Sequence, residues 1–130
     1  MDASEEKPDY QRSPAEIEQL IEDGALLIDV RADYEFEAAH LVGAERIGLE
    51  TVAERRDQID PAVPVVFYCR TGTRSAMAAD AFADAGYEVN LLEGGITAWI
   101  AEGREIEPAD GYVAEPGQAA AILEAKARHN

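Results

Sequence analysis

The sequence predicts an α/β domain in which helices cover both faces of a parallel sheet. Short apolar runs alternate with amphipathic segments along the chain, and glycine or proline separates them. The runs at 25–30 and 63–69 are apolar almost throughout, which is typical of parallel strands buried on both faces. A length of 130 residues with 47% hydrophobic content supplies one core, so two independent domains are not expected.

The first half of this pattern contains a clear helix start. Ser13 is a helix N-cap, Pro14 takes the first helical position and Glu16 completes a capping box, while Gly24 can end the helix in a left-handed turn. Around this helix we expect a short first strand at 10–12, the buried strand at 25–30, a short helix at 34–39, a short strand at 44–47 and a helix at 50–59.

The second half repeats the alternation of strand and helix. Ala78 and Phe82 face inward from one expected helix, and Ile96 and Trp99 face inward from the last. The elements expected here are a strand at 63–69, a helix at 75–85, a strand at 87–92 and a helix that starts after Gly94 and Gly95 and ends at Gly103.

Three regions divide the chain. Residues 1–9 are charged and without periodicity, so a flexible tail is expected, and residues 10–103 form the domain. Residues 104–130 are expected to be an acidic linker followed by a C-terminal helix. That helix is expected to dock either on its own domain or on a second subunit, and the second case would produce a homodimer. Its apolar positions are Ala119, Ile122 and Leu123.

The chain is strongly acidic. Eleven Lys and Arg residues against 27 Asp and Glu residues give a formal net charge of −16. This field repels nucleic-acid phosphates and anionic membranes, so we expect neither as a partner. Nine arginines but only two lysines, with many alanines and glutamates, resemble the composition of halophilic proteins. Salt would screen the repulsion between their surface carboxylates.

Cysteine content and the first residues bear on the cellular compartment. Cys69 is the single cysteine, which excludes an internal disulfide, a two-thiol redox motif and a cysteine-rich zinc site. No run approaches the roughly 20 apolar residues needed to span a bilayer. Residues 1–7 are acidic, whereas a signal peptide is basic and then apolar, so a cytoplasmic protein is expected.

Cys69 is the main candidate for chemistry. It ends an apolar strand, and ligands of parallel α/β sheets bind beyond the carboxyl ends of the strands. A lone cysteine there is often only a packing residue. However, the loop from Arg70 to Ser75 is too polar for the core, and its amides, the helix start and two arginines favour a thiolate. No carboxylate occurs between Asp60 and Asp80, so the loop suits a small oxyanion or an anionic sulfur donor.

Three segments, spread over about residues 10–103, resemble the rhodanese-like sulfurtransferases. Leu27 to Ala44 is similar to the N-terminal signature of that family, and Leu92 to Trp99 is similar to the C-terminal one. Ala39, Val42 and Ile96 replace the usual glycine, proline and aromatic residue, which affects packing and turn rigidity but not the loop. The most specific segment resembles the active loop Cys-x-x-Gly-x-Arg-Ser and consists of Cys69, Arg70, Thr71, Gly72, Thr73, Arg74 and Ser75.

This resemblance implies a five-stranded parallel sheet with helices on both faces and a double displacement at Cys69. The thiolate attacks the outer sulfur of a donor such as thiosulfate, sulfite leaves, and the persulfide passes its sulfur to cyanide, a thiol or a protein. The loop from Arg70 to Ser75 holds the persulfide and the donor. Arg74, ahead of Arg70, orients the donor and stabilises the leaving sulfite. No metal and no organic cofactor is implied.

Other polar residues near the strand ends are given structural roles. Asp29 and Arg31 end a buried strand and are expected to form a hydrogen-bonded brace at the edge of the site, with Glu35 as a further candidate member. His40 lies between a short helix and a short strand, where a structural hydrogen bond is a better explanation than catalysis. Trp99 is expected in the core.

Two other functions compete with sulfur transfer. Cysteine phosphatases and arsenate reductases also use a loop from Cys to Arg around an oxyanion. They place five residues between the two, whereas four separate Cys69 from Arg74, which crowds a phosphate. The other alternative is a non-catalytic regulatory or interaction module that keeps the fold. The presence of Cys69 within a complete loop favours the enzyme.

Overall fold

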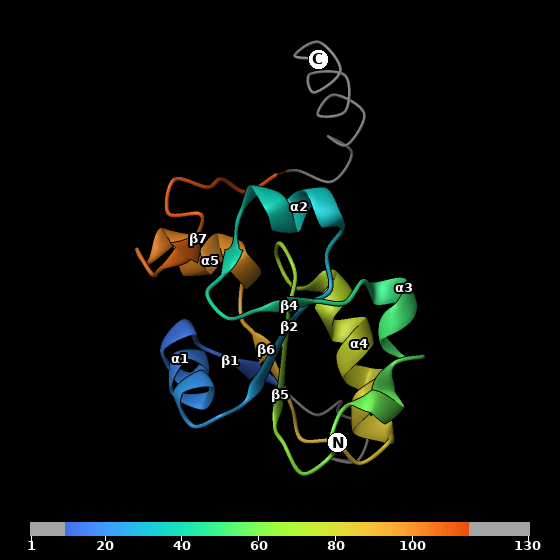
Figure 1. Cartoon of the computed structure of the whole chain (residues 1–130). Helices are drawn as coiled ribbons and strands as arrows, with labels where there is room; N and C mark the ends of the chain where they lie inside the picture. Colours follow the sequence, from blue (N-terminus) through green and yellow to red (C-terminus); the bar gives the residue numbers. More distant parts are fainter. Residues whose placement is uncertain (1–9, 115–130) are drawn as a thin grey trace, which may run out of the picture.

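The computed structural model describes residues 10–114 (Figure 1). Its main sheet has five parallel strands in the order β1-β6-β5-β2-β4, which confirms the expected fold class. The expectations for residues 1–9 and for a C-terminal helix lie outside the described residues. The strands are β1 (Gln11–Arg12), β2 (Leu26–Asp29), β4 (Glu45–Arg46), β5 (Val65–Tyr68) and β6 (Val89–Leu92).

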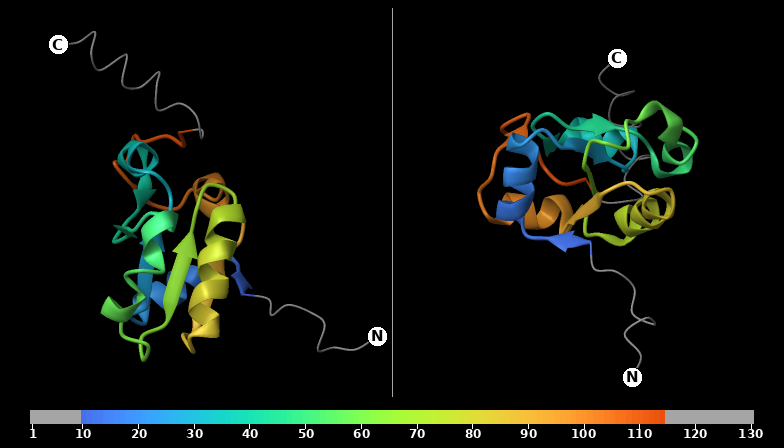
Figure 2. Two further views of the ribbon diagram at one scale, coloured as in Figure 1. Left: turned by 90° about the vertical axis from the view of Figure 1, so that its right-hand side faces the viewer. Right: turned by 90° about the horizontal axis from the view of Figure 1, so that it is seen from below.

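Helices cover both faces of the sheet, and the view from below in Figure 2 separates the two layers. One face carries α1 and α5, and the other carries α3 and α4. The expected capping box is present at the start of α1, where the Ser13 Oγ accepts the Glu16 amide and the Glu16 carboxylate accepts the Ser13 amide. The helices are α1 (Pro14–Glu22), α2 (Asp33–Ala38), α3 (Leu49–Val52), α4 (Thr73–Asp84) and α5 (Gly95–Ala101).

Each face of the sheet has its own core cluster. On the α4 side Phe67 packs edge-on against Phe82, with ring centroids 4.9 Å apart. On the other side Tyr68 packs in a cluster with Trp99. β5 is buried at all four positions because its alternate side chains enter both clusters. This arrangement places the end of β5, and therefore Cys69, at the centre of the sheet.

The segment expected as one helix at 50–59 is divided. It forms α3 and the 3₁₀ helix η2 (Arg56–Gln58). Val52 and Ile59 are its only fully buried positions, and charged residues occupy most of the chain between them. Two apolar positions so far apart do not make the continuous stripe that holds a longer helix on a core.

The structure also differs from the linker expected to begin at residue 104. Residues 104–114, which we call the C-terminal strap, pack against the domain. Within the strap β7 (Ile106–Glu107) pairs antiparallel with β3 (His40–Leu41) in a second, two-stranded sheet. Ala114 is fully buried at the end of the strap. Strands of two residues are too short to show a hydrophobic period, so composition alone indicated a loop.

Candidate active site

Cys69 directly follows β5, and the loop after it leads into α4 at the carboxyl ends of the parallel strands (Figure 1). The amide of Gly72 donates a hydrogen bond to the Cys69 Sγ at 3.1 Å. The Ser75 Oγ lies 3.6 Å from the same sulfur and donates to the Gly72 carbonyl at 3.0 Å. Because Cys69 is only 1% exposed, its sulfur is shielded from bulk water and is stabilised by the groups of the loop itself.

Gly72 gives the loop its shape. Its φ of 133° lies in a region that side chains other than glycine rarely adopt, and it is the N-cap of α4. The following residues, Thr73 to Ser75, form the first turn of this helix, in which amides have no partner further back in the helix. The end of the loop therefore presents backbone donors to any anion that forms next to Cys69.

Helix α5 holds the carbonyl side of the loop. The Ile96 amide donates to the Cys69 carbonyl at 3.0 Å, and the amide and Oγ1 of Thr97 donate to the Arg70 carbonyl at 3.3 and 3.0 Å. Gly95 allows this approach, since a Cβ there would lie 2.4 Å from both carbonyl oxygens. Because the carbonyls of Cys69 and Arg70 are hydrogen-bonded to α5, they point toward that helix, and the Gly72 amide of the loop faces the Cys69 sulfur.

Arg74 and Glu35 form a bidentate ion pair that ties α2 to the active loop. The Nη1–Oε1 and Nη2–Oε2 distances are 2.7 and 2.9 Å, and Glu35 is 1% exposed. The hydrogen bonding of Arg74 to the Glu35 carboxylate, which accepts from the guanidinium, is the main cause of a raised pKa of Arg74, to which the charge of Cys69 also contributes. Glu35, expected beside Asp29 and Arg31, thus uses its carboxylate chiefly on Arg74.

The environment of Glu35 makes the stability of the fold sensitive to acid. Burial by itself raises the pKa of Glu35, but hydrogen bonds from Arg74 and the Ala32 amide outweigh it and lower the pKa below 4.5. The pKa of Glu35 is therefore lower in the folded protein than in the unfolded chain. Its contribution to the free energy of unfolding is complete at a pH above its pKa in the unfolded chain, and it is lost as the pH falls through its pKa in the folded protein. We expect the free energy of unfolding to fall more steeply below about pH 4.5 in the wild type than in Glu35→Gln. Urea titrations across this range check it, and parallel curves would contradict it.

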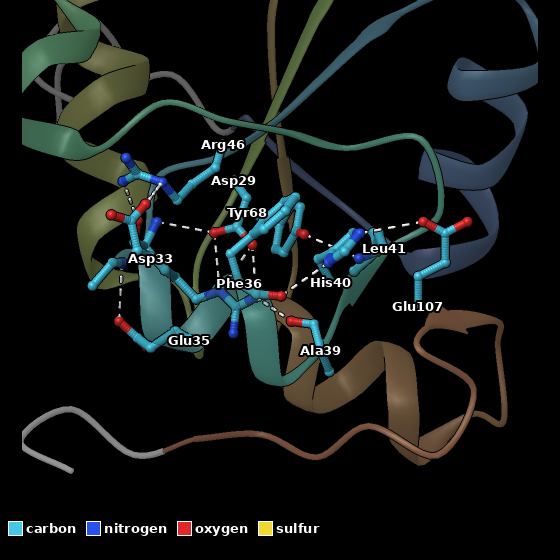
Figure 3. A network of polar contacts seen from close by, with 12 residues as sticks. Asp29, Asp33, Glu35, Phe36, Ala39, His40, Leu41, Arg46, Tyr68 and Glu107 are labelled. Atoms are coloured by element: carbon cyan, nitrogen blue, oxygen red, sulfur yellow. Dashed lines mark hydrogen bonds and ion pairs between the residues drawn. The ribbon is translucent and has the colours of Figure 1, made fainter. Parts of the chain in front are cut away.

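Asp29, labelled in Figure 3, forms the expected hydrogen-bonded pair with Arg31, and both residues are fully buried at the end of β2. The Arg31 Nε and Nη2 donate to the Asp29 carboxylate at 2.9 and 2.6 Å, and Nη2 also donates to the Ala39 carbonyl at 2.7 Å. Burial lowers the pKa of Arg31, but the hydrogen bond and charge of Asp29 reverse this and raise it. The guanidinium lies 5.6 Å from the ring centroid of Tyr68, whose hydroxyl accepts the Leu41 amide.

His40 belongs to the same edge of the domain and has structural partners (Figure 3). Its Nδ1 lies 2.9 Å from the Phe36 carbonyl, and its ring stacks on the Phe36 ring at a centroid distance of 3.8 Å. Its Nε2 lies 3.2 Å from the Glu107 carboxylate of the strap. His40 therefore connects α2, β3 and β7.

The remaining loop residues surround this centre. Thr71 and Thr73 are exposed, and Arg70 is half-buried. The sequence did not single out Thr97 or Tyr68, because their contacts come from segments distant along the chain. Within residues 10–114, no group of three or more His, Cys, Asp or Glu side chains is placed to hold a metal ion. No helix in this range has the length and apolar character needed to cross a membrane.

Comparisons with known proteins show the family to which the chain belongs. Residues 13–102 match a family model described as a rhodanese-like domain. Thiosulfate sulfurtransferase GlpE of Pseudomonas aeruginosa is 34% identical over 103 residues, which are 78% of this chain and 90% of GlpE. The uncharacterized protein YqhL of Bacillus subtilis is 40% identical over 76 residues. That match covers 58% of this chain and 60% of YqhL, so the likeness to YqhL is partial.

Solved structures agree with the fold. The BH2092 protein of Bacillus halodurans has a TM-score of 0.70 at 25% identity, with 82% of each chain covered. A rhodanese-related protein of Thermoplasma volcanium has a TM-score of 0.70 at 23% identity, covering 75% of this chain and 97% of that chain, which is a likeness of fold. The family model spans more than half of the chain and includes the whole loop around Cys69. The chain therefore belongs to the family of rhodanese-like domains.

Proposed function

We propose that this protein is a sulfurtransferase that moves a sulfane sulfur through a persulfide on Cys69. The donor is thiosulfate or a persulfide, and the acceptor is cyanide, a thiol or a protein. The observation that carries the proposal is the short contact between the Gly72 amide and the Cys69 Sγ, at the start of a loop that ends in Arg74. The 34% identity to a protein named thiosulfate sulfurtransferase supports thiosulfate as the first donor to test.

The first half of the reaction forms the persulfide. The Cys69 thiolate attacks the outer sulfur of thiosulfate, a new S–S bond forms, and the S–S bond of thiosulfate breaks so that its electron pair leaves with sulfite. The Gly72 amide and the first-turn amides of α4 stabilise the negative charge that then resides on the outer sulfur. Arg74, held by Glu35, supplies a fixed positive charge near the sulfonate of the donor.

The second half returns the enzyme to its starting state. The acceptor attacks the outer sulfur of the persulfide, its new bond to sulfur forms, and the electron pair of the broken S–S bond returns to Cys69 as thiolate. The same backbone donors stabilise this thiolate. Donor and acceptor therefore use one site in turn, which is double-displacement behaviour.

Intact mass measurement tests the proposal directly. Reduced wild-type protein is incubated with thiosulfate in high salt, and cyanide is added while thiocyanate is assayed. We expect a gain of one sulfur atom that cyanide removes with formation of thiocyanate, because Cys69 is the only cysteine. Folded Cys69→Ser protein should gain nothing. Absence of an adduct on folded wild-type protein, with thiosulfate and with glutathione persulfide, would contradict sulfur transfer and favour the non-catalytic module.

A further inference from the structure

The C-terminal strap contacts both elements that hold the active loop, although it lies beyond residues 13–102 that match the family model. Its start is attached to α5. The Trp99 Nε1 donates to the Glu105 carbonyl at 2.8 Å, and the Arg104 amide donates to the Trp99 carbonyl at 3.3 Å. Since α5 binds the carbonyls of Cys69 and Arg70, one end of the strap is anchored to the helix behind the loop.

The far end of the strap is attached to α2 and β3. β7 pairs with β3, and the Tyr112 amide donates to the Ala38 carbonyl at 3.1 Å. Gly111 lies so close to the end of α2 that a Cβ there would be 2.4 Å from the Ala38 carbonyl oxygen and 2.9 Å from the Ala39 Cβ. Figure 1 shows the strap running from β7, beside α5, across to α2.

Helix α2 needs this support. It has six residues, and a helix this short is not stable without tertiary contacts. Glu35 is its only fully buried residue, while Tyr34, Phe36 and Ala38 are half-buried, so α2 places little apolar surface in the core. The contacts that place it include the ion pair of Glu35 with Arg74, the ion pair of Asp33 with Arg46, the Phe36–His40 contacts and the hydrogen bond from the strap to the Ala38 carbonyl. A shift of the strap therefore moves the carboxylate that holds Arg74.

We propose that the C-terminal strap is a positioning element of the active loop: by joining α5 to α2, it sets the place of Glu35 and thereby of Arg74 beside Cys69. This inference rests on the proposed role of Cys69 as the nucleophile. The strap takes no part in bond making, and from its end at α2 its effect reaches the sulfur through Glu35 and Arg74.

Alkylation of Cys69 tests the strap without any sulfur donor. Because the chain has one cysteine, the rate of iodoacetamide addition, followed by intact mass, reports on Cys69 alone. Gly111→Ala pushes the strap away from α2, and we expect alkylation to slow by about 2- to 30-fold, the usual range of coupling between sites. Ile59→Ala is the control, because Ile59 is a buried residue beside the starts of β2 and β5, at the other end of these strands from the active loop, and its loss destabilises the core.

Combining Gly111→Ala with Glu35→Gln distinguishes an effect that acts through Glu35 from a general destabilisation of the domain. In a Glu35→Gln background, Gly111→Ala should change the alkylation rate by less than about twofold, because the route through Glu35 is already broken. A wild-type rate in Gly111→Ala, an equal slowing in Ile59→Ala, or full additivity with Glu35→Gln would overturn the proposal. If Gly111→Ala does not fold, Ile106→Ala, which weakens β7, takes its place under the same criteria.

The two proposals can fail separately. If wild-type protein gains no sulfur from thiosulfate or from glutathione persulfide, the proposed function fails, while the alkylation rates still decide whether the strap positions the loop. If wild-type protein gains sulfur but Gly111→Ala is alkylated and loaded at the wild-type rate, sulfur transfer stands and the strap proposal fails.

Discussion

Gly95→Ala should reduce sulfur loading of Cys69 by at least about 100-fold, the loss expected when reacting groups are displaced by about 1 Å. An alanine Cβ would lie 2.4 Å from the carbonyl oxygens of Cys69 and Arg70, which are backbone atoms that cannot turn aside. The strain at a φ of 62° adds to this clash. The loop must therefore leave α5, and the hydrogen bonds from Ile96 and Thr97 are lost with it.

Gly86→Ala is the matched control for this prediction. Gly86 also has a left-handed φ, of 89°, but a Cβ there would meet nothing within 4 Å, and it follows the far end of α4. We expect a stability loss of about 1 kcal/mol from backbone strain, with near wild-type sulfur loading. Loading by intact mass and thermal melting are measured on both variants. Comparable loading by Gly95→Ala and Gly86→Ala would show that contact with α5 does not shape the loop.

Arg31→Leu should lower the free energy of unfolding by about 3–5 kcal/mol, the usual cost of leaving one buried charge without its partner. Arg31 and Asp29 are both fully buried, so the substitution leaves the Asp29 carboxylate without the guanidinium that compensates its charge. The hydrogen bond to the Ala39 carbonyl and the contact with the Tyr68 ring are lost as well. Urea unfolding at neutral pH measures the effect.

Arg46→Leu provides the comparison, because Arg46 pairs with Asp33 at the surface, where the Asp33 side chain is 78% exposed. Solvent compensates the Asp33 carboxylate that remains, so the loss of this ion pair should cost no more than about 1 kcal/mol. We also expect Asp29→Leu to restore part of the stability of Arg31→Leu, since the uncompensated carboxylate of Asp29 is then removed. Equal losses for Arg31→Leu and Arg46→Leu would rule out this account of the buried pair.

Local patterns in the sequence were sufficient for most of the domain. Each of the five parallel strands and α1, α2, α4 and α5 lies within a few residues of its expected position, because buried strands, capping boxes and glycine stops are local signals. The loop from Cys69 to Ser75 could also be located, since a polar loop after an apolar strand is visible without knowledge of contacts. The prediction of one helix at 50–59 was wrong, because the two buried positions of this segment do not form a continuous apolar stripe along a helix.

The sequence by itself therefore determined the α/β class, the position of Cys69 at a strand end and the polar loop that follows it. Only the tertiary structure decided which groups hold that loop. Glu35 and Arg74 are 39 positions apart, and β3 and β7 are separated by most of the domain. Such pairs leave no period or local motif, because they depend on how the chain folds back on itself, and a two-residue strand is stabilised only by its partner.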